Sequence, residues 1–372
     1  MKKILIIDDS ALMRRVLSDI INADSQLTVA DTACNGQQAL DLLQAGNTYD
    51  VAVCDIKMPK VDGVEFLRRM NKGGYKLPVL ICSSIASKSA NETIEALNLG
   101  AFDFVKKPSG TIGSVFREFE ESVISRLHLA CNLEDRDILF KETENKPLKK
   151  IEKPTISRMD TKVPGIKDVP ENHVAHGVKR GDSLLVIASS TGGPKALQSV
   201  VPLLPADFPY PIVLVQHMPK GFTESLANRL DEISLVKVKE AADGDCLEKG
   251  VVYVAKGGKQ CELVQNKAGK YSLSINDKAP RGGLRPCADI FFESLVNTSF
   301  EKIYCIVLTG MGADASEGIR LVKDVKKVEV VVQDKETCVV YGMPKAVEAL
   351  GLADEIVPLE SVTKTMLKKI GV

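Results

Sequence analysis

The chain opens on Ile4-Leu5-Ile6-Ile7-Asp8-Asp9-Ser10, an apolar run that ends directly in two carboxylates. A later apolar run, Val51-Ala52-Val53-Cys54, ends in the same way at Asp55. Uninterrupted apolar runs are typical of strands buried on both faces of a parallel sheet, and ligands bind outside the carboxyl ends of such strands. We therefore expect Asp8, Asp9 and Asp55 to converge at one edge of an α/β domain.

The chemistry of three clustered carboxylates indicates a cation site. Carboxylates repel one another unless a cation joins them, and Mg²⁺ takes about six oxygen ligands, commonly including those of a phosphate. The cluster therefore predicts phosphoryl transfer assisted by Mg²⁺. The alternative is that Asp8-Asp9-Ser10 only caps the helix that follows, because acidic residues and serine favour helix N-termini. Capping alone does not account for Asp55.

The first 128 residues repeat one unit five times, an apolar run followed by a helical pattern. This alternation predicts a doubly wound parallel sheet, here a five-unit (βα)5 domain. The fourth run ends at Ser83, and the fifth leads through Phe104 to Lys107, so a hydroxyl and an ammonium group join the same edge. The expected strands lie near 3–7, 27–31, 50–54, 78–82 and 102–105, and the expected helices near 11–22, 36–45, 62–72, 90–98 and 112–128.

In these positions the N-terminal part resembles the receiver domain of two-component response regulators. The resemblance implies that Asp55 is the phosphoacceptor, charged by a histidine kinase, and that Ser83 and Lys107 contact the phosphoryl group. It also implies a switching aromatic residue at Phe104 and a cis peptide bond at Lys107–Pro108. The Mg²⁺ ligands that it implies are Asp8, Asp9, Asp55 and the backbone carbonyl of Lys57.

Length and composition favour a multidomain protein of the cytoplasm. The chain has 372 residues, enough for two or three domains, and its 49 Lys and Arg balance its 49 Asp and Glu. Without a net positive field, binding to nucleic acid or to an anionic membrane is not expected. No apolar run approaches the length of a membrane span, so we expect no direct membrane insertion. The nine cysteines include no Cys-x-x-Cys pair, and we expect them to be reduced.

A change in sequence texture separates two domains. Residues 129–182 contain four prolines, interleaved charges and a single aromatic residue, Phe140. Such a segment has too little apolar surface to offset the entropy of ordering it. We therefore expect a receiver at 1–128, a linker at 129–182 and a second domain at 183–372.

The second domain begins with another apolar run, 183–188, which leads into Ser189-Ser190-Thr191-Gly192-Gly193-Pro194 and a helical pattern. This order predicts a second, larger Rossmann-like parallel sheet. The loop has two interpretations: its backbone N–H groups either cradle a phosphate or form an oxyanion hole beside a nucleophilic serine. The loop alone leaves both open.

Two further strand ends favour the nucleophile. His217 is the only histidine after the linker, and it directly follows the apolar run 212–216. Histidine is the side chain suited to activating a serine hydroxyl near neutral pH. A third run, 303–308, precedes Asp314, whose carboxylate can orient an imidazole. The order serine, histidine, aspartate differs from that of chymotrypsin, subtilisin and the α/β hydrolases, so the expected triad is a convergent one.

The second domain resembles the chemotaxis protein-glutamate methylesterases. The resemblance implies that Ser190 is the nucleophile, His217 the general base and Asp314 its orienting carboxylate. It also implies that the backbone N–H groups of Thr191 and Met311 bind the oxyanion. The motifs that carry it are Ser-Thr-Gly-Gly-Pro at 190–194, Gln-His-Met-Pro at 216–219, and Leu-Thr-Gly-Met-Gly at 308–312 with Asp314.

The motifs contain two adjacent serines and one departure from the family's pattern. Ser189 precedes Ser190, and the residues themselves do not say which serine attacks. The family's motif favours Ser190, because it places the nucleophile directly before Thr-Gly-Gly. Ala315 stands where the family usually has glycine.

The resemblance implies a complete function. The family hydrolyses glutamate γ-methyl esters on chemoreceptors in chemotaxis adaptation, which releases methanol and restores glutamate, and its members also deamidate receptor glutamines. The esterase reaction needs no cofactor. We expect the unphosphorylated receiver to cover the Ser190 edge and phosphorylated Asp55 to weaken that contact. A rival interpretation makes the second domain a non-catalytic phosphate or nucleotide binder, and a DNA-binding regulator is discounted because no basic recognition helix is apparent.

Overall fold

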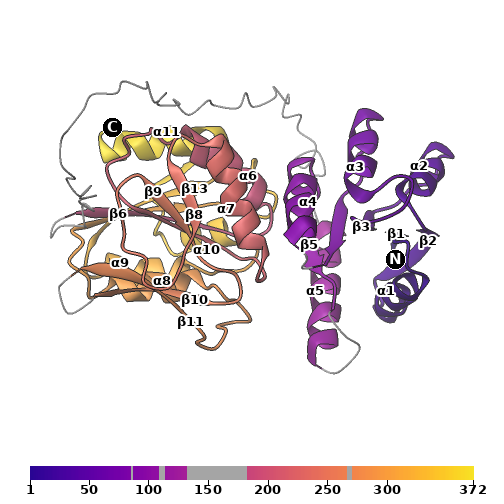
Figure 1. Cartoon of the computed structure of the whole chain (residues 1–372), viewed down its shortest axis with the longest axis horizontal. Helices are drawn as coiled ribbons and strands as arrows, with labels where there is room; N and C mark the ends of the chain where they lie inside the picture. The colour runs from indigo at the N-terminus through magenta and orange to yellow at the C-terminus, as the bar shows by residue number, and fades with distance from the viewer. Residues whose placement is uncertain (85–86, 109–113, 132–181, 266–269) are drawn as a thin grey trace, which may run out of the picture.

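The computed structural model describes residues 1–84, 87–108, 114–131, 182–265 and 270–372. Most of the expected linker, residues 132–181, therefore lies outside the described residues. The described chain forms two α/β domains that lie side by side (Figure 1). The prediction of two parallel-sheet domains is confirmed.

The N-terminal domain is a five-stranded parallel sheet in the order β2-β1-β3-β4-β5. The central strands β1 and β3 are buried apolar runs, as a sheet with helices on both faces requires. Three of the helices begin at a side-chain N-cap. Ser10, Asn35 and Asp62 each accept a hydrogen bond from a backbone N–H of the first turn. The strands are β1 (Lys2–Ile7), β2 (Leu27–Ala33), β3 (Val51–Asp55), β4 (Val79–Ser83) and β5 (Asp103–Lys106), and the helices are α1 (Ala11–Ala23), α2 (Gly36–Gln44), α3 (Gly63–Lys72), α4 (Ser87–Asn98) and α5 (Ser114–Cys131).

The second domain is built on a seven-stranded parallel sheet in the order β14-β13-β12-β6-β7-β9-β8, with a separate antiparallel hairpin of β10 and β11. Strands β6, β7 and β12 are the three apolar runs singled out in the sequence, and they are adjacent in the sheet. The strands are β6 (Ser183–Ser189), β7 (Ile212–Gln216), β8 (Lys237–Glu240), β9 (Val251–Val254), β10 (Gln260–Gln265), β11 (Tyr271–Asn276), β12 (Lys302–Val307), β13 (Lys327–Gln333) and β14 (Glu355–Val357). The helices are α6 (Gly193–Val200), the 3-10 turn η2 (Val201–Leu203), α7 (Phe222–Ile233), α8 (Ala288–Leu295), α9 (Ser316–Lys323), α10 (Met343–Ala349) and α11 (Leu359–Ile370).

The two domains meet through α4 and β5 on one side and α6 and α7 on the other (Figure 1). Phe104 of β5 packs on Phe222 at the start of α7, with ring centroids 4.6 Å apart. Asn98 at the end of α4 accepts a hydrogen bond from Gln198 of α6. Val340 of the second domain belongs to a buried apolar cluster that otherwise consists of buried N-terminal-domain side chains. The interface therefore combines apolar packing with polar contacts.

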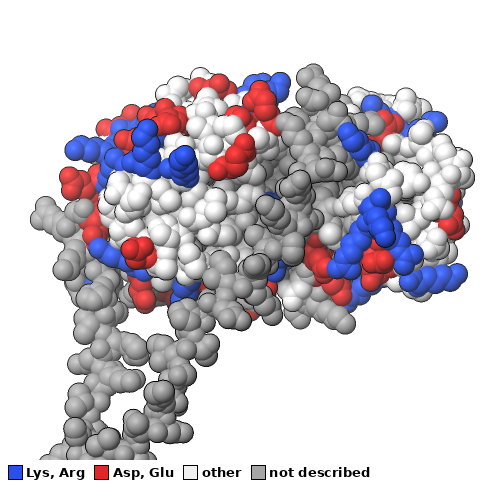
Figure 2. All heavy atoms as spheres, turned by 90° about the horizontal axis from the view of Figure 1, so that it is seen from above, with Lys and Arg blue, Asp and Glu red and all other residues white. Residues whose placement is uncertain are grey.

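The surface carries charges of both signs. On the face shown in Figure 2, basic and acidic side chains both occur on each domain. This distribution agrees with the balanced composition. Within the described ranges, no helix combines the length and the apolar character that crossing a membrane requires.

Candidate active site

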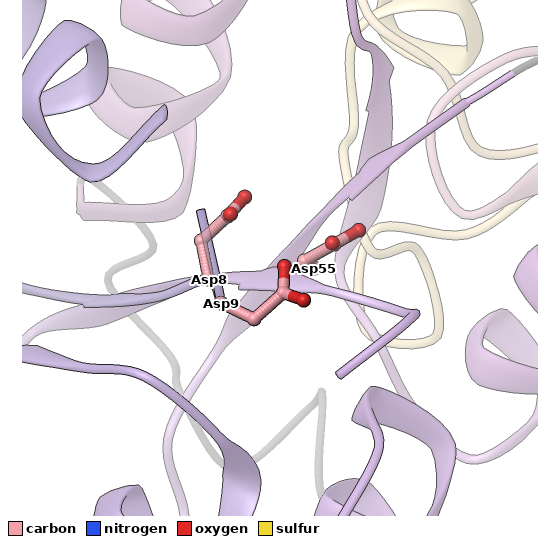
Figure 3. Close-up of side chains that lie close together, drawn as sticks. All are labelled: Asp8, Asp9 and Asp55. Carbon is pink, nitrogen blue, oxygen red and sulfur yellow. The ribbon is translucent and has the colours of Figure 1, made fainter. Parts of the chain in front are cut away.

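The acidic residues of the N-terminal domain converge as expected. Asp8 and Asp9 directly follow β1, and Asp55 ends the neighbouring strand β3. One carboxylate oxygen of each residue lies within 4.8 Å of the others (Figure 3). Carboxylate oxygens at this spacing are hard donors of the kind that Mg²⁺ takes, so the three residues fit the expected ion.

Lys107 joins two of these carboxylates. Its Nζ lies 2.8 Å from Asp8 Oδ2 and 2.8 Å from Asp55 Oδ2. Burial raises the pKa of Asp55, and the hydrogen bond and charge of Lys107 oppose that rise. Burial by itself would lower the pKa of Lys107, but its hydrogen bonds to Asp55 and Asp8 outweigh this and raise the pKa above the ordinary value. The ammonium is thus held charged at the centre of the site.

The other expected receiver residues lie at the same edge. Ser83 ends β4, is buried, and its Oγ accepts a hydrogen bond from Thr93 Oγ1 at 2.8 Å. Lys57 lies in the loop two residues beyond Asp55, where its carbonyl stays a predicted ligand. The expected cis peptide at Lys107–Pro108 is wrong, because that bond is trans. A trans bond is the form that an X–Pro peptide favours by about 0.5–1 kcal/mol unless its surroundings select otherwise.

We expect Lys107→Met to make the stability of the N-terminal domain depend on Mg²⁺. Without divalent cation, removal of the ammonium leaves Asp8 and Asp55 facing each other, and loss of one partner from a buried ion pair costs about 3 kcal/mol. Urea unfolding with and without Mg²⁺ measures this loss, and Mg²⁺ should restore most of it.

Lys106→Met is the matched control for this variant. Lys106 ends β5 one residue earlier and is also half-buried. Its replacement should change stability by only a few tenths of a kcal/mol with or without the ion. Equal losses in both variants, with no response to Mg²⁺, would show that Lys107 does not compensate the carboxylates.

The three expected triad residues lie on three adjacent strands of the second sheet. Ser190 follows β6, His217 follows β7, and Asp314 lies in the loop after β12. The backbone also joins the first two strand ends, because the His217 N–H donates at 3.1 Å to the carbonyl of Ser189, the residue before Ser190. All three therefore gather at the carboxyl edge of the sheet.

His217 and Asp314 form a direct hydrogen bond. His217 Nε2 lies 2.6 Å from Asp314 Oδ2, and both side chains are buried. Asp314 also accepts the Ala288 N–H at 2.6 Å, the Asp289 N–H at 2.9 Å and the Cys287 S–H at 3.1 Å. These donors sit at the N-terminus of α8, where a helix favours negative charge. The carboxylate is therefore fixed at both of its oxygens.

The protonation of this pair follows from its partners. Burial would raise the pKa of Asp314, but the hydrogen bond and charge of His217, together with the Asp289 and Ala288 N–H groups, hold it well below its usual range. An ionised carboxylate only accepts hydrogen bonds, so Nε2 of His217 carries a proton toward Asp314, and in the neutral form of the imidazole this is the only ring proton. His217 Nδ1 is buried and has no hydrogen-bond partner. Its lone pair is thus available to take a proton from a nucleophile.

The structure distinguishes the two adjacent serines. Ser189 is fully buried, and its Oγ–H donates to Gln216 Oε1 at 2.7 Å. Ser190 is partly exposed, and among the described residues its hydroxyl has no hydrogen-bond partner. The geometry favours Ser190 as the attacking group, because a hydroxyl already paired in the core cannot reach a substrate.

Two backbone N–H groups beside Ser190 are also available. Within the described ranges, neither the Thr191 N–H nor the Met311 N–H has an intramolecular acceptor. The Ser190 N–H, by contrast, donates to the Thr309 carbonyl at 3.0 Å. Unpaired donors at this position are what an oxyanion hole requires.

Ala315 explains why the family usually has glycine there. Its φ of 83° lies in the left-handed region, which costs a non-glycine residue about 1–2 kcal/mol. Its methyl group is fully buried, which returns about 0.8 kcal/mol. Burial of the methyl group therefore offsets only part of the strain, and the neighbouring Asp314 still bonds His217.

The sequence interpretation missed one contact that reaches this site from the other domain. Thr191 Oγ1 donates to Asp103 Oδ2 of β5 at 2.7 Å, and Arg126 of α5 lies on the same oxygen at 3.1 Å. Thr191 is 5% exposed, so the receiver covers the residue next to Ser190. Nothing in the sequence signals this pairing, because the residues belong to different domains.

Comparisons with known proteins agree with both halves of the molecule. Residues 4–112 match the response regulator receiver domain family, and residues 185–366 match the CheB methylesterase family. A solved structure, the CheB methylesterase catalytic domain of Thermotoga maritima, is 40% identical and covers 50% of this chain and 98% of its own, with a TM-score of 0.49.

Full-length relatives join the two halves. A protein-glutamate methylesterase/protein-glutamine glutaminase of Syntrophomonas wolfei is 39% identical over 372 residues, 99% of each chain. One from Bacillus subtilis is 37% identical over 368 residues, 98% of each chain. The architecture is that of a response regulator whose output domain is a hydrolase. The chain belongs to the family of protein-glutamate methylesterases/protein-glutamine glutaminases.

Proposed function

We propose that this protein hydrolyses glutamate γ-methyl esters on chemoreceptors, releases methanol, and does so when its receiver is phosphorylated. The names of the full-length relatives support the activity, and deamidation of receptor glutamines follows from the same names. The observation that carries the proposal is the His217–Asp314 hydrogen bond of 2.6 Å, which leaves the imidazole Nδ1 unpaired on the strand next to Ser190. A phosphate-binding loop would have no use for this pair.

The chemistry is acyl transfer through a serine ester. Ser190 Oγ attacks the ester carbonyl while His217 Nδ1 takes the hydroxyl proton and then delivers it to the departing methoxide. The Thr191 and Met311 N–H groups receive the oxyanion of the tetrahedral intermediate. Water then attacks the acyl carbonyl and gives a proton to the same nitrogen, and that proton passes to Ser190 Oγ as the bond between Oγ and the acyl carbon breaks and glutamate is released. A glutamine side chain follows the same path with ammonia as the leaving group.

Asp55 is the proposed phosphoacceptor, and a histidine kinase of the chemotaxis system is the proposed donor. Asp8, Asp9, Asp55 and the Lys57 carbonyl would hold Mg²⁺, which supplies charge neutralisation for the phosphoryl group when it is bound. Lys107 and Ser83 would contact that group, because both lie at the same edge of the sheet. The esterase reaction proposed for the second domain uses only side chains and backbone N–H groups of this chain.

Strand β5 supports a link between the two sites. Lys107 follows β5 and contacts Asp55, whereas Asp103 and Phe104 of the same strand contact Thr191 and Phe222 in the second domain. A phosphoryl group on Asp55 that attracts the Lys107 ammonium would change the contacts of a residue only four positions from Asp103 at the interface. We infer that phosphorylation weakens docking and uncovers Ser190. Each tenfold rise in the open population needs only about 1.4 kcal/mol of differential interaction.

The test is methanol release from methylated receptor membranes, with and without Mg²⁺ and acetyl phosphate. We expect the intact protein to release methanol faster when the phosphodonor is present. Asp55→Asn should keep the basal rate and lose the response, because an amide cannot accept the phosphoryl group. Release from neither protein, with folded enzyme and competent membranes, would leave the second domain as a binder.

Loosening the interface should activate the enzyme without phosphate. Phe104→Ala removes the ring that packs on Phe222, and truncation of a buried phenylalanine costs about 3–5 kcal/mol. Even part of this loss, taken from docking, should raise the unphosphorylated rate about tenfold or more. The double variant Phe104→Ala/Asp55→Asn is the control and should show the same raised rate. A basal rate equal to that of the parent protein would argue against inhibition by docking.

A further inference from the structure

Gln216 lies between the residues proposed to carry the chemistry, and its side chain touches both of them. It ends β7 and is 1% exposed. Its Nε2 donates to the backbone carbonyl of Ser190 at 2.9 Å and to its neighbour His217's carbonyl at 3.2 Å. Its Oε1 accepts the Ser189 hydroxyl at 2.7 Å. Both N–H bonds and the oxygen of one amide are therefore in use.

The chain is shaped to hold this amide. A Cβ atom at Gly193 would lie 2.0 Å from Gln216 Oε1, so a side chain at this position would displace the amide from beneath the turn after Ser190. Gly193 in turn donates its N–H to the Ser190 carbonyl at 2.8 Å. The Ser190 carbonyl thus accepts two hydrogen bonds, one from the Gly193 N–H in the turn and one from the Gln216 side chain on the neighbouring strand.

Such a contact matters because acyl transfer depends on the distance between hydroxyl and base. A misplacement of about 1 Å can cost about 10²-fold in rate. Ser190 and His217 lie on different strands, and their side chains are not otherwise joined in the resting molecule. A rigid, fully paired amide between their backbones fixes the separation of the two residues.

We propose that Gln216 is a positioning residue that holds the backbones of Ser190 and His217 at the separation proton transfer requires. This inference rests on the proposed function of the same site. Gln216 is buried and out of reach of a substrate, so its effect falls on the rate of the chemical step and leaves substrate affinity unchanged.

Two substitutions remove the donors in different ways. Gln216→Glu keeps the shape and loses both N–H donors, and Gln216→Met keeps the approximate length and loses all polar atoms. Ser189→Ala is the matched control. It removes the third hydrogen bond of the amide and leaves the two hydrogen bonds to the Ser190 and His217 carbonyls in place. If Gln216 only stabilises the fold, all three variants should behave alike once the folded fraction is taken into account.

The experiment measures kcat and KM for methanol release by the full chain under acetyl phosphate, together with the thermal midpoint of each variant. We expect kcat to fall about 10- to 100-fold in both Gln216 variants with KM within about threefold, and Ser189→Ala to stay within about threefold of the parent in both. A change confined to KM, or a kcat loss of equal size in Ser189→Ala, would overturn the proposal.

Labelling with a fluorophosphonate separates this proposal from the proposed function. The Ser190 oxygen displaces fluoride from phosphorus, and its proton passes to the base. Labelling is carried out under acetyl phosphate and Mg²⁺, which uncover Ser190 in the proposed function, so its rate reports the serine–histidine geometry without any receptor. The Gln216 variants should label about 10-fold more slowly or worse, and Ser189→Ala at the parent rate. Absence of labelling in the parent would instead reject the nucleophile itself. Should one Gln216 variant not fold, the other decides, and parent-like labelling in it would refute the positioning role.

Discussion

Ser190→Ala should reduce methanol release from methylated receptor membranes by about 10⁴-fold or more, while phosphorylation at Asp55 continues. The loss is this large because the neighbouring hydroxyl of Ser189 cannot take the place of Ser190. Ser189 is fully buried and donates its proton to Gln216. What remains should be only the contribution of the oxyanion donors and of substrate binding.

Ser189→Ala is the natural partner of that experiment. It removes the adjacent hydroxyl and leaves Ser190 intact, so the rate should fall by less than about threefold. Steady-state methanol release and incorporation of a radiolabelled phosphodonor should be measured on both variants. If Ser189→Ala were the inactive variant and Ser190→Ala the active one, the assignment of the nucleophile would be reversed.

Asp314→Asn should cost a similar amount, about 10⁴-fold in kcat, for a different reason. The carboxylate accepts four hydrogen bonds, from His217, Cys287, Ala288 and Asp289. An amide must turn its NH₂ group toward at least one of these donors. Where the NH₂ group faces His217, the imidazole loses the acceptor that fixes its proton on Nε2, and Nδ1 is no longer reliably the free base.

Asp289→Asn tests whether the loss is specific. Asp289 carries a second carboxylate on the first turn of α8, and burial raises its pKa to about 6. Its side chain bonds the Gly318 N–H and not the imidazole, so we expect less than a tenfold loss. Comparable losses at 289 and 314 would point to the general field of the helix terminus and not to the imidazole contact. Circular dichroism should accompany both, because an anion at this helix terminus also supports the fold.

The parts of the site that the sequence predicted share one physical basis. Asp8, Asp55 and His217 directly follow apolar runs, and parallel strands bring such positions to one edge of a sheet. The strand period and the buried runs are local properties, so both sheets and the edge of each could be expected without coordinates. The family motifs then supplied the roles, which remain predictions.

What the sequence did not predict depends on contacts between distant segments. The groups at 287–289 that donate hydrogen bonds to Asp314 lie at the N-terminus of α8, and no apolar run precedes this helix to predict its position. The choice between Ser189 and Ser190 depends on Gln216, a residue 27 positions away from Ser189. The contact between Asp103 and Thr191 spans 88 positions and two domains. Periodicity carries no information about such pairs, because they arise only when finished elements pack.

The orientation of the His217 ring has a consequence for reach. Nδ1 is bonded to Cγ, the ring carbon attached to Cβ, whereas Nε2 lies on the far side of the ring. In this structure it is Nε2 that bonds Asp314. The atom left for the serine is therefore the one nearer to the main chain of β7. Nδ1 lies close to Cβ and therefore moves little when the His217 side chain rotates. The backbone must therefore place Ser190 beside it. In the proposed mechanism, the parallel pairing of β6 with β7 is therefore what brings Ser190 to Nδ1 of His217.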